Sequence, residues 1–212
     1  KERSKGMYVF GIGIVWTLLQ LGPLKFKGIA FTCDTTTLGF GLVAGLLLTG
    51  SNILLLESLT RIDVSLGSTI YRLNTIGVVI LAFLFLHEPL GLLKCLGILC
   101  GITGVLLLYQ RKEDSFQSST FALFYGMAIA ASLMRAAYGV ISKAGIEQLA
   151  DPQTMLVLIA SSWIVGGACY AALRERRFRM TRKKALYSVV SGVLVFLIVN
   201  FPYFFKPYSI LL

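Results

Sequence analysis

The amino-acid sequence predicts an all-α protein, a polytopic transmembrane helix bundle of about seven helices. Of the 212 residues, 56% are hydrophobic and only 14% are charged, whereas soluble domains average about 45–50% and about 25%. The charged residues are also clustered, which leaves uncharged stretches of about 20 residues, the length that a helix needs to span a bilayer. A soluble core does not account for this pattern.

Seven stretches meet this length criterion. Five contain no charged residue and cover 6–24, 35–56, 115–134, 152–173 and 185–205. Two more tolerate one basic residue each and cover 64–86, with Arg72, and 89–110, with Lys94. The first stretch has a basic start, as a signal peptide does, but no small-residue cleavage site follows it. We therefore expect a retained span there.

Short connections predict which spans are neighbours. The three spans between residues 35 and 110 follow one another closely, so each consecutive pair should pack antiparallel. Small residues permit close helix packing in lipid, and two glycine pairs, Gly41/Gly45 and Gly97/Gly101, have the four-residue spacing of such a face. We expect these glycines at the contacts between the three spans.

The span 64–86 carries the strongest functional signal. Polar residues recur on one helix face of this apolar segment: Ser65, Ser68, Thr69, Arg72 and Thr75. A charge inside lipid is costly unless it has a partner or faces a water-filled cavity. Arg72 either lines such a polar interior, near Asn52 or a helix-end carbonyl, or extends its long side chain to the headgroups. We favour the cavity because it also accounts for the other four residues.

A weaker polar face follows in the span 115–134 and just beyond it. Its members are Ser132, Arg135, Gly139 and Ser142. About twenty uncharged residues precede Arg135, which places it near one membrane surface, and both interpretations stay open for it. Asn52 and Asn200 are expected either to hydrogen bond to a neighbouring helix or to bind polar groups of a solute.

Composition and motifs exclude several functions. The net charge of +10 arises from basic residues in short loops without interleaved aromatics, which predicts contact with anionic membrane lipids and no nucleic acid partner. The four cysteines lack metal-ligand spacing, so no metal site is predicted. With one histidine and no acidic cluster, we predict no catalytic residues and no cofactor, and an intramembrane enzyme is the least favoured function.

An internal repeat is suggested by the order of spans and loops. The same order of elements occurs twice: a span, a basic loop, and a second span that carries a glycine and then an asparagine. The pairs are Gly45/Asn52 and Gly192/Asn200. This pattern predicts a first repeat at 1–112 and a partial second repeat at 113–212 within a ten-helix inverted-repeat fold. One helix before the chain and two after it would then be missing, so both ends are expected to be truncations.

The middle of the chain resembles a known family. The residues that carry the resemblance are Ser68-Thr69-Ile70-Tyr71-Arg72-Leu73-Asn74, Leu84-Phe85-Leu86-His87-Glu88-Pro89-Leu90, and Gly97-Ile98 to Gly104-Val105-Leu106-Leu107. They are similar to the EamA-type drug/metabolite transporter superfamily. The resemblance implies two inverted five-helix repeats and a multi-pass protein of a cell membrane, here the bacterial inner membrane, that carries metabolites, amino acids or drugs. It also implies a structural helix-cap role for Glu88.

The predicted function is that of a secondary carrier that works by alternating access, with its small-molecule substrate bound between the repeats. The residues expected along the substrate pathway are Asn52, Ser68, Thr69, Tyr71, Arg72, Asn74 and Arg135. The alternative is a non-transporting remnant or scaffold, and homo-oligomer formation stays open. Membrane orientation stays open too, because the basic loops favour a cytoplasmic amino terminus and the family pattern favours the opposite.

Overall fold

The computed structural model describes residues 4–26, 31–89, 91–109, 119–176, 178 and 180–205. Within these residues the protein is all-helical, with eight α-helices, one π-helical turn and no strand. Six helical segments in this part of the chain are long and apolar enough to cross a membrane, and Leu92–Gly104 is a shorter apolar helix. The predicted polytopic helical bundle is confirmed.

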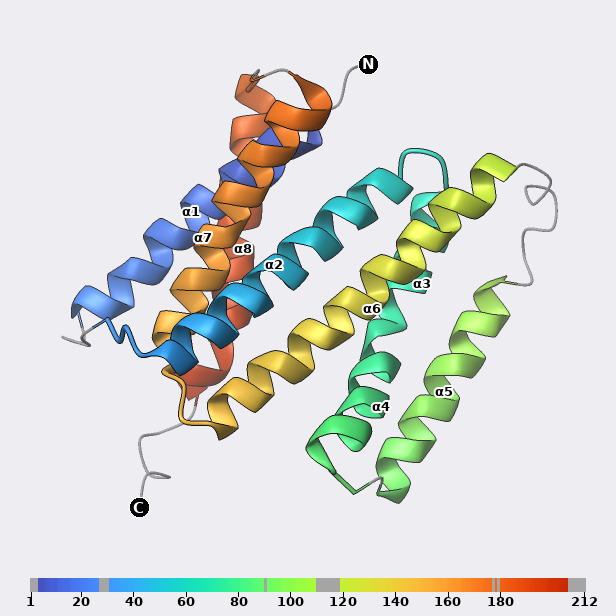
Figure 1. Cartoon of the computed structure of the whole chain (residues 1–212). Helices are drawn as coiled ribbons and strands as arrows, with labels where there is room; N and C mark the ends of the chain where they lie inside the picture. Colours follow the sequence, from blue (N-terminus) through green and yellow to red (C-terminus); the bar gives the residue numbers. More distant parts are fainter. Residues whose placement is uncertain are drawn as a thin grey trace. The chain divides into compact units, whose positions relative to one another are not determined.

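The helices form two compact units (Figure 1). Unit 1 holds the helices before Asp34 and after Ala150, and unit 2 holds those between these residues. Unit 1 comprises α1 (Lys5–Phe26), α7 (Pro152–Tyr170), the π-helical turn η2 (Ala171–Glu175) and α8 (Arg182–Phe205). Unit 2 comprises α2 (Thr35–Ser58), α3 (Val64–Arg72), α4 (Asn74–Leu86), α5 (Leu92–Tyr109) and α6 (Ser119–Glu147). The boundaries of the two units differ from those of the predicted repeats at 1–112 and 113–212. The repeats stay a prediction, because helix packing does not test whether the sequence is repeated.

Two of the helices begin at matching caps. The carboxylate of Asp34 accepts the backbone N–H of Thr37 at 2.8 Å at the start of α2. The carboxylate of Asp151 accepts the N–H of Thr154 at 2.7 Å at the start of α7, where Pro152 occupies the first turn. Each cap satisfies one of the amide groups that a helix start leaves without an intrahelical partner. Local sequence therefore sets where these two spans begin.

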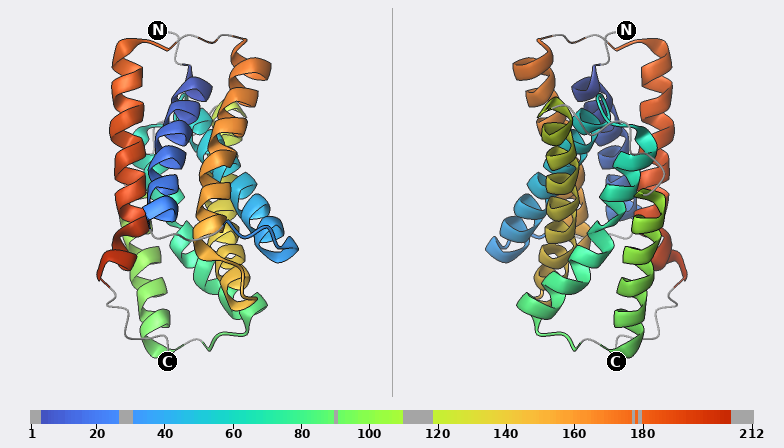
Figure 2. Two further views of the ribbon diagram at one scale, coloured as in Figure 1. Left: turned by 90° about the vertical axis from the view of Figure 1, so that its left-hand side faces the viewer. Right: turned by 90° about the vertical axis from the view of Figure 1, so that its right-hand side faces the viewer.

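The central helix of unit 1 is α1, which lies between α7 and α8 (Figure 2). It runs antiparallel to α7, since its start at Gly6 contacts Ala171 and its end at Gln20 contacts Gln153. It runs parallel to α8, because Tyr8 contacts Ser191 and Gln20 contacts Asn200. This arrangement joins segments that are 180 residues apart in sequence.

Glycines set the closeness of the contact between α1 and α7. A Cβ atom added to Gly6 would lie 2.6 Å from the backbone nitrogen of Ala171, and one added to Gly167 would lie 2.5 Å from that of Phe10. The backbones of the two helices therefore touch, as small residues allow in membrane bundles. Neither glycine belongs to the pairs that the sequence predicts as packing faces.

The central helix of unit 2 is α6, which packs antiparallel on α2 and parallel to α3 and α4 (Figure 1). This corrects the predicted neighbour order, in which α2 packs on the helix that follows it. Gly41 and Gly45 are buried as expected, but Gly97 is exposed, and an added Cβ atom there would meet no described atom within 4 Å. The short connection after α2 brings only the end of α2 close to α3. The longer helix α6 therefore makes most of the contact with α2.

Candidate functional site

The span predicted as one helix at 64–86 is interrupted at Leu73, where α3 ends and α4 begins. The N–H of Leu73 donates to the carbonyl of Ile70 at 3.0 Å, three residues back, and the regular four-residue pattern resumes with Gly77 donating to Leu73 at 3.0 Å. Helix ends leave carbonyl and amide groups without intrahelical partners. Arg72 and Asn74 flank this break directly.

The predicted polar row follows the exposed side of α3. Ser65, Ser68, Arg72 and Thr75 are exposed, and Thr69, Tyr71 and Asn74 are half-buried. The hydroxyls of Ser68 and Thr69 both donate to the carbonyl of Ser65, at 2.9 and 2.8 Å. The other side of α3 packs on the core of unit 2 through Leu66 and Ile70. Four members of the predicted row, Ser65, Ser68, Arg72 and Thr75, are thus exposed, away from the core of the unit, and their place in a polar interior stays a prediction.

The contact predicted between Arg72 and Asn52 is not formed. Arg72 is exposed and makes no hydrogen bond or ion pair with another residue that the structure describes. Asn52 is half-buried on α2, and its amide donates to the carbonyl of Leu48 in its own helix at 2.7 Å. Asn52 is engaged locally because the carbonyl one turn earlier lies within reach of its short side chain.

Arg135 lies much deeper in its span than the sequence predicted. Helix α6 has 29 residues and continues to Glu147, beyond the predicted end at 134, so Arg135 falls near the middle of the span Ala122–Glu147. Its guanidinium carbon lies 5.4 Å from the ring centroid of Tyr138. This cation–π contact partly offsets the free-energy cost of moving the charge out of water. Unit 2 therefore carries two arginines, Arg72 and Arg135, inside apolar spans.

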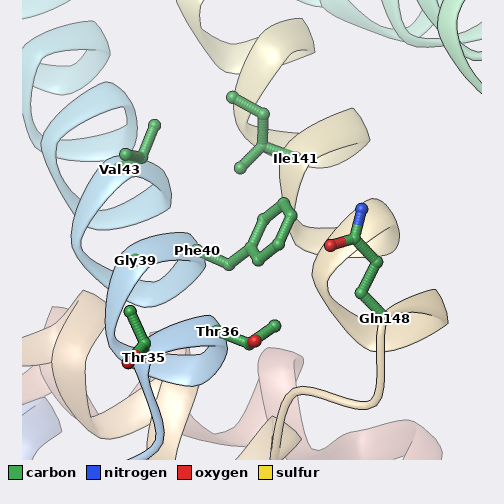
Figure 3. A pocket seen from close by; sticks show the side chains of 7 residues that line it. All are labelled: Thr35, Thr36, Gly39, Phe40, Val43, Ile141 and Gln148. Carbon is green, nitrogen blue, oxygen red and sulfur yellow. The ribbon is translucent and has the colours of Figure 1, made fainter.

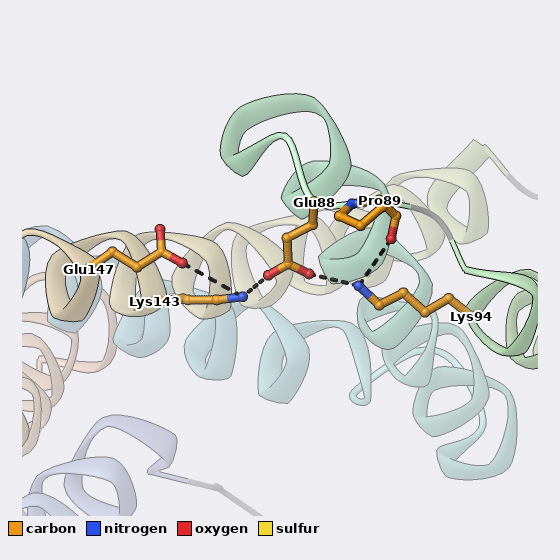
Figure 4. Close-up of polar contacts among 5 residues, drawn as sticks. All are labelled: Glu88, Pro89, Lys94, Lys143 and Glu147. Carbon is orange, nitrogen blue, oxygen red and sulfur yellow. Dashed lines mark hydrogen bonds and ion pairs between the residues drawn. The ribbon is translucent and has the colours of Figure 1, made fainter. Parts of the chain in front are cut away.

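Glu88, whose helix-cap role stays a prediction, forms ion pairs with two lysines (Figure 4). It follows His87, which ends α4 in a left-handed conformation at φ 53°. The Glu88 carboxylate lies 2.8 Å from the ammonium of Lys94 on α5 and also pairs with Lys143 on α6, which in turn lies 3.8 Å from Glu147. The carboxylate thus links the turn before α5 to α6 through two charge-assisted contacts.

Unit 1 contains a buried amide cluster that the sequence revealed only in part. Gln20 on α1 is fully buried, and Asn200 on α8 is 5% exposed. The amide of Asn200 donates to Gln20 at 2.9 Å, and Gln20 donates to Gln153 on α7 at 3.2 Å. For Asn200 this confirms the interhelical hydrogen bond. Gln20 was missed, although an amide within an otherwise apolar span is itself a signal.

The chain matches a known protein family. A family model described as the EamA-like transporter family matches residues 5–110, which is half of the chain. The matched range contains α1 to α5, and with them the break at Leu73 and the turn at Glu88. Neither the curated proteins nor the solved structures give a match.

Proposed function

This chain belongs to the EamA-like transporter family, and we propose that it moves small organic solutes across the membrane along a path that includes the break at Leu73. The family consists of membrane transporters, and the apolar spans agree with a multi-pass membrane protein. The bacterial inner membrane stays the predicted location. The finer proposal concerns the solute and the mechanism.

The interruption of the span at Leu73 is the observation that carries this proposal. Non-helical backbone at membrane depth is tolerated where it is covered by protein or lines a water-filled cavity. In many carriers, broken helices supply the solute site through their free backbone groups. Here the break lies beside an exposed arginine and a row of hydroxyls, so cation, amide and hydroxyl groups are available together.

The electrostatics of the break favour a solute with an anionic or strongly polarised oxygen. Arg72 offers five N–H donors in a planar fork, which suits a carboxylate or a phosphate. Asn74, the first residue of α4, adds a side-chain amide beside the guanidinium. Ser68 and Thr69 donate to a carbonyl, so their oxygens can still accept. We propose alternating access, in which one half of the transporter rocks against the other around this site.

The test is solute flux into proteoliposomes that contain the purified chain. Labelled organic anions, neutral solutes and organic cations are compared for the wild type, Arg72→Ala and the control Arg61→Ala. Arg61 is also exposed, but it lies in the turn before α3 and outside the polar row. We expect Arg72→Ala to lower anion flux at least about 10-fold, as loss of a charged hydrogen-bonding partner does, and Arg61→Ala to retain it.

Arg72→Lys sharpens the test, because an ammonium keeps the charge and loses the fork geometry. Flux that stays unchanged in Arg72→Ala would refute the role of Arg72. A chain that moves none of the solutes faster than protein-free liposomes would favour the alternative of a non-transporting scaffold. Reduced insertion of Arg72→Ala would assign the residue to folding.

A further inference from the structure

A groove in unit 2 lies away from the polar row of α3 (Figure 3). It has a volume of about 380 Å³, within the range of about 300–1,000 Å³ typical of ligand sites, and it opens between the start of α2 and the end of α6. Its lining residues are Thr35, Thr36, Gly39, Phe40, Val43, Ile141 and Gln148.

The lining changes from polar to apolar with depth along α2. Thr35 and Thr36 stand at the first turn of this membrane-length helix, whereas Val43 lies about 10 Å further along the helix axis. Gln148, just beyond the end of α6, adds an amide at the polar end. Gly39 leaves the groove open, since a Cβ atom there would meet no described atom within 4 Å. The groove therefore matches an amphiphile with its polar group at the membrane boundary.

A negative charge lies next to the mouth of the groove, at Asp34. Asp34 precedes Thr35 and is exposed, and hydrogen bonds from Thr37 hold the pKa of its carboxyl below the usual value, so it is ionised at neutral pH. Asp34 forms no ion pair with another residue in the part of the chain that the structure describes. Lys94 and Lys143 on α5 and α6 are engaged by Glu88. A cationic headgroup is thus favoured over an anionic one.

We propose that this groove binds one membrane phospholipid, with an acyl chain along Phe40, Val43 and Ile141 and a primary-amine headgroup beside Asp34. Other apolar side chains on α2 also face outward, since Leu42 is 49% and Leu46 is 67% exposed. Hydroxyl groups of Thr35 and Thr36 can donate to the phosphate and ester oxygens. The lipid would thereby cover the apolar gap between two helix ends.

The experiment measures lipid retention by native mass spectrometry. The wild-type chain is purified in mild detergent after exchange against phosphatidylethanolamine, phosphatidylcholine or phosphatidylglycerol with identical acyl chains. We expect one phosphatidylethanolamine to be retained per chain, at least about 10-fold more often than phosphatidylglycerol, as the carboxylate repels an anionic headgroup.

Two variants and one control locate the bound lipid. Gly39→Leu places a side chain in the groove, at a position where its Cβ atom would meet no described atom within 4 Å, and should abolish retention, whereas the control Gly97→Leu adds the same side chain at an equally open glycine on α5. Asp34→Asn keeps the helix cap and removes the charge, so it should lose the preference for the primary amine. Thermal unfolding midpoints verify that all three variants fold.

Three outcomes would overturn the proposal. Equal retention in Gly39→Leu and the wild type would place the lipid elsewhere. An unchanged headgroup preference in Asp34→Asn would remove the role of the carboxylate. Retention of a single-chain alkylamine without retention of any phospholipid would assign the groove to a free amphiphile.

Discussion

The two units of this protein share a helix arrangement but bury different kinds of polar side chain. In each unit, one central helix, α1 or α6, packs antiparallel on one neighbour and parallel to another. Unit 1 buries its amides at Gln20 and Asn200 between helices. Unit 2 leaves the polar row of α3 exposed, and the polar side chains that it buries among the described residues carry hydroxyls, such as Ser51, which donates to the carbonyl of Ala131 at 2.7 Å.

This difference separates two uses of polar groups in a membrane protein. A buried amide that meets another amide adds a directional contact where lipid provides no hydrophobic drive between helices. An exposed hydroxyl or guanidinium adds little to packing and stays available to a solute. The comparison therefore predicts that substitutions in unit 1 alter stability most and that those in the polar row of unit 2 alter transport.

The largest expected effect on stability comes from the glycine contact of unit 1. In Gly167→Ala the new methyl group would lie 2.5 Å from the backbone nitrogen of Phe10, and backbone cannot move aside as a side chain can. We expect a loss of about 3 kcal/mol in the free energy of unfolding, measured by denaturant titration with circular dichroism. The matched control Gly97→Ala should be neutral or stabilising by up to about 1 kcal/mol, because alanine is the better helix former. Equal stability of the two variants would contradict tight packing of α1 on α7.

The second effect compares two asparagines. Asn200→Leu removes the partner of the buried Gln20, so we expect a loss of about 1–2 kcal/mol in unfolding free energy. Asn52→Leu should change this free energy by less than about 0.5 kcal/mol, because Asn52 is half-buried and bonds only to its own helix. A larger loss in Asn52→Leu than in Asn200→Leu would reverse the comparison between the units.

The third effect concerns the ion pairs of Glu88. The lysine side chains that it contacts, Lys94 and Lys143, are 43% and 49% exposed, so water and salt screen both pairs. Glu88→Gln should lower the unfolding free energy by about 0.5 kcal/mol at low salt. The difference from the wild type should vanish at about 1 M salt, where the screening length is about 3 Å. A loss that persists at high salt would point to packing in place of charge.

The smallest effect on stability is expected at Arg72. Because this side chain is exposed and makes no polar contact among the described residues, Arg72→Ala should change the unfolding free energy by less than about 0.5 kcal/mol. The same preparation should show the loss of solute flux proposed above. A large destabilisation with flux intact per folded molecule would turn Arg72 into a structural residue and remove the contrast between the units.

Hydropathy and local motifs alone determined much of this protein. The described parts of the segments predicted to span the membrane are helical, although the helix in 89–110 is shorter than a span, and Ser65, Ser68 and Arg72 lie exposed on α3. The run around Arg72 and the turn at Glu88 lie within the range that the family model matches. These features could be predicted because transfer into lipid is decided residue by residue and helical periodicity is local.

Only the tertiary structure decided which helices are central, how deep Arg135 lies and what Glu88 contacts. Gln20 meets Asn200 across 180 residues of sequence, and α2 packs on α6 although α3 follows it directly. The break at Leu73 lies within a span whose sequence carries no proline. Lipid tails solvate all apolar helix faces alike, so the choice among partners depends on the shape and polar groups of helices far apart in sequence, and local patterns do not encode it.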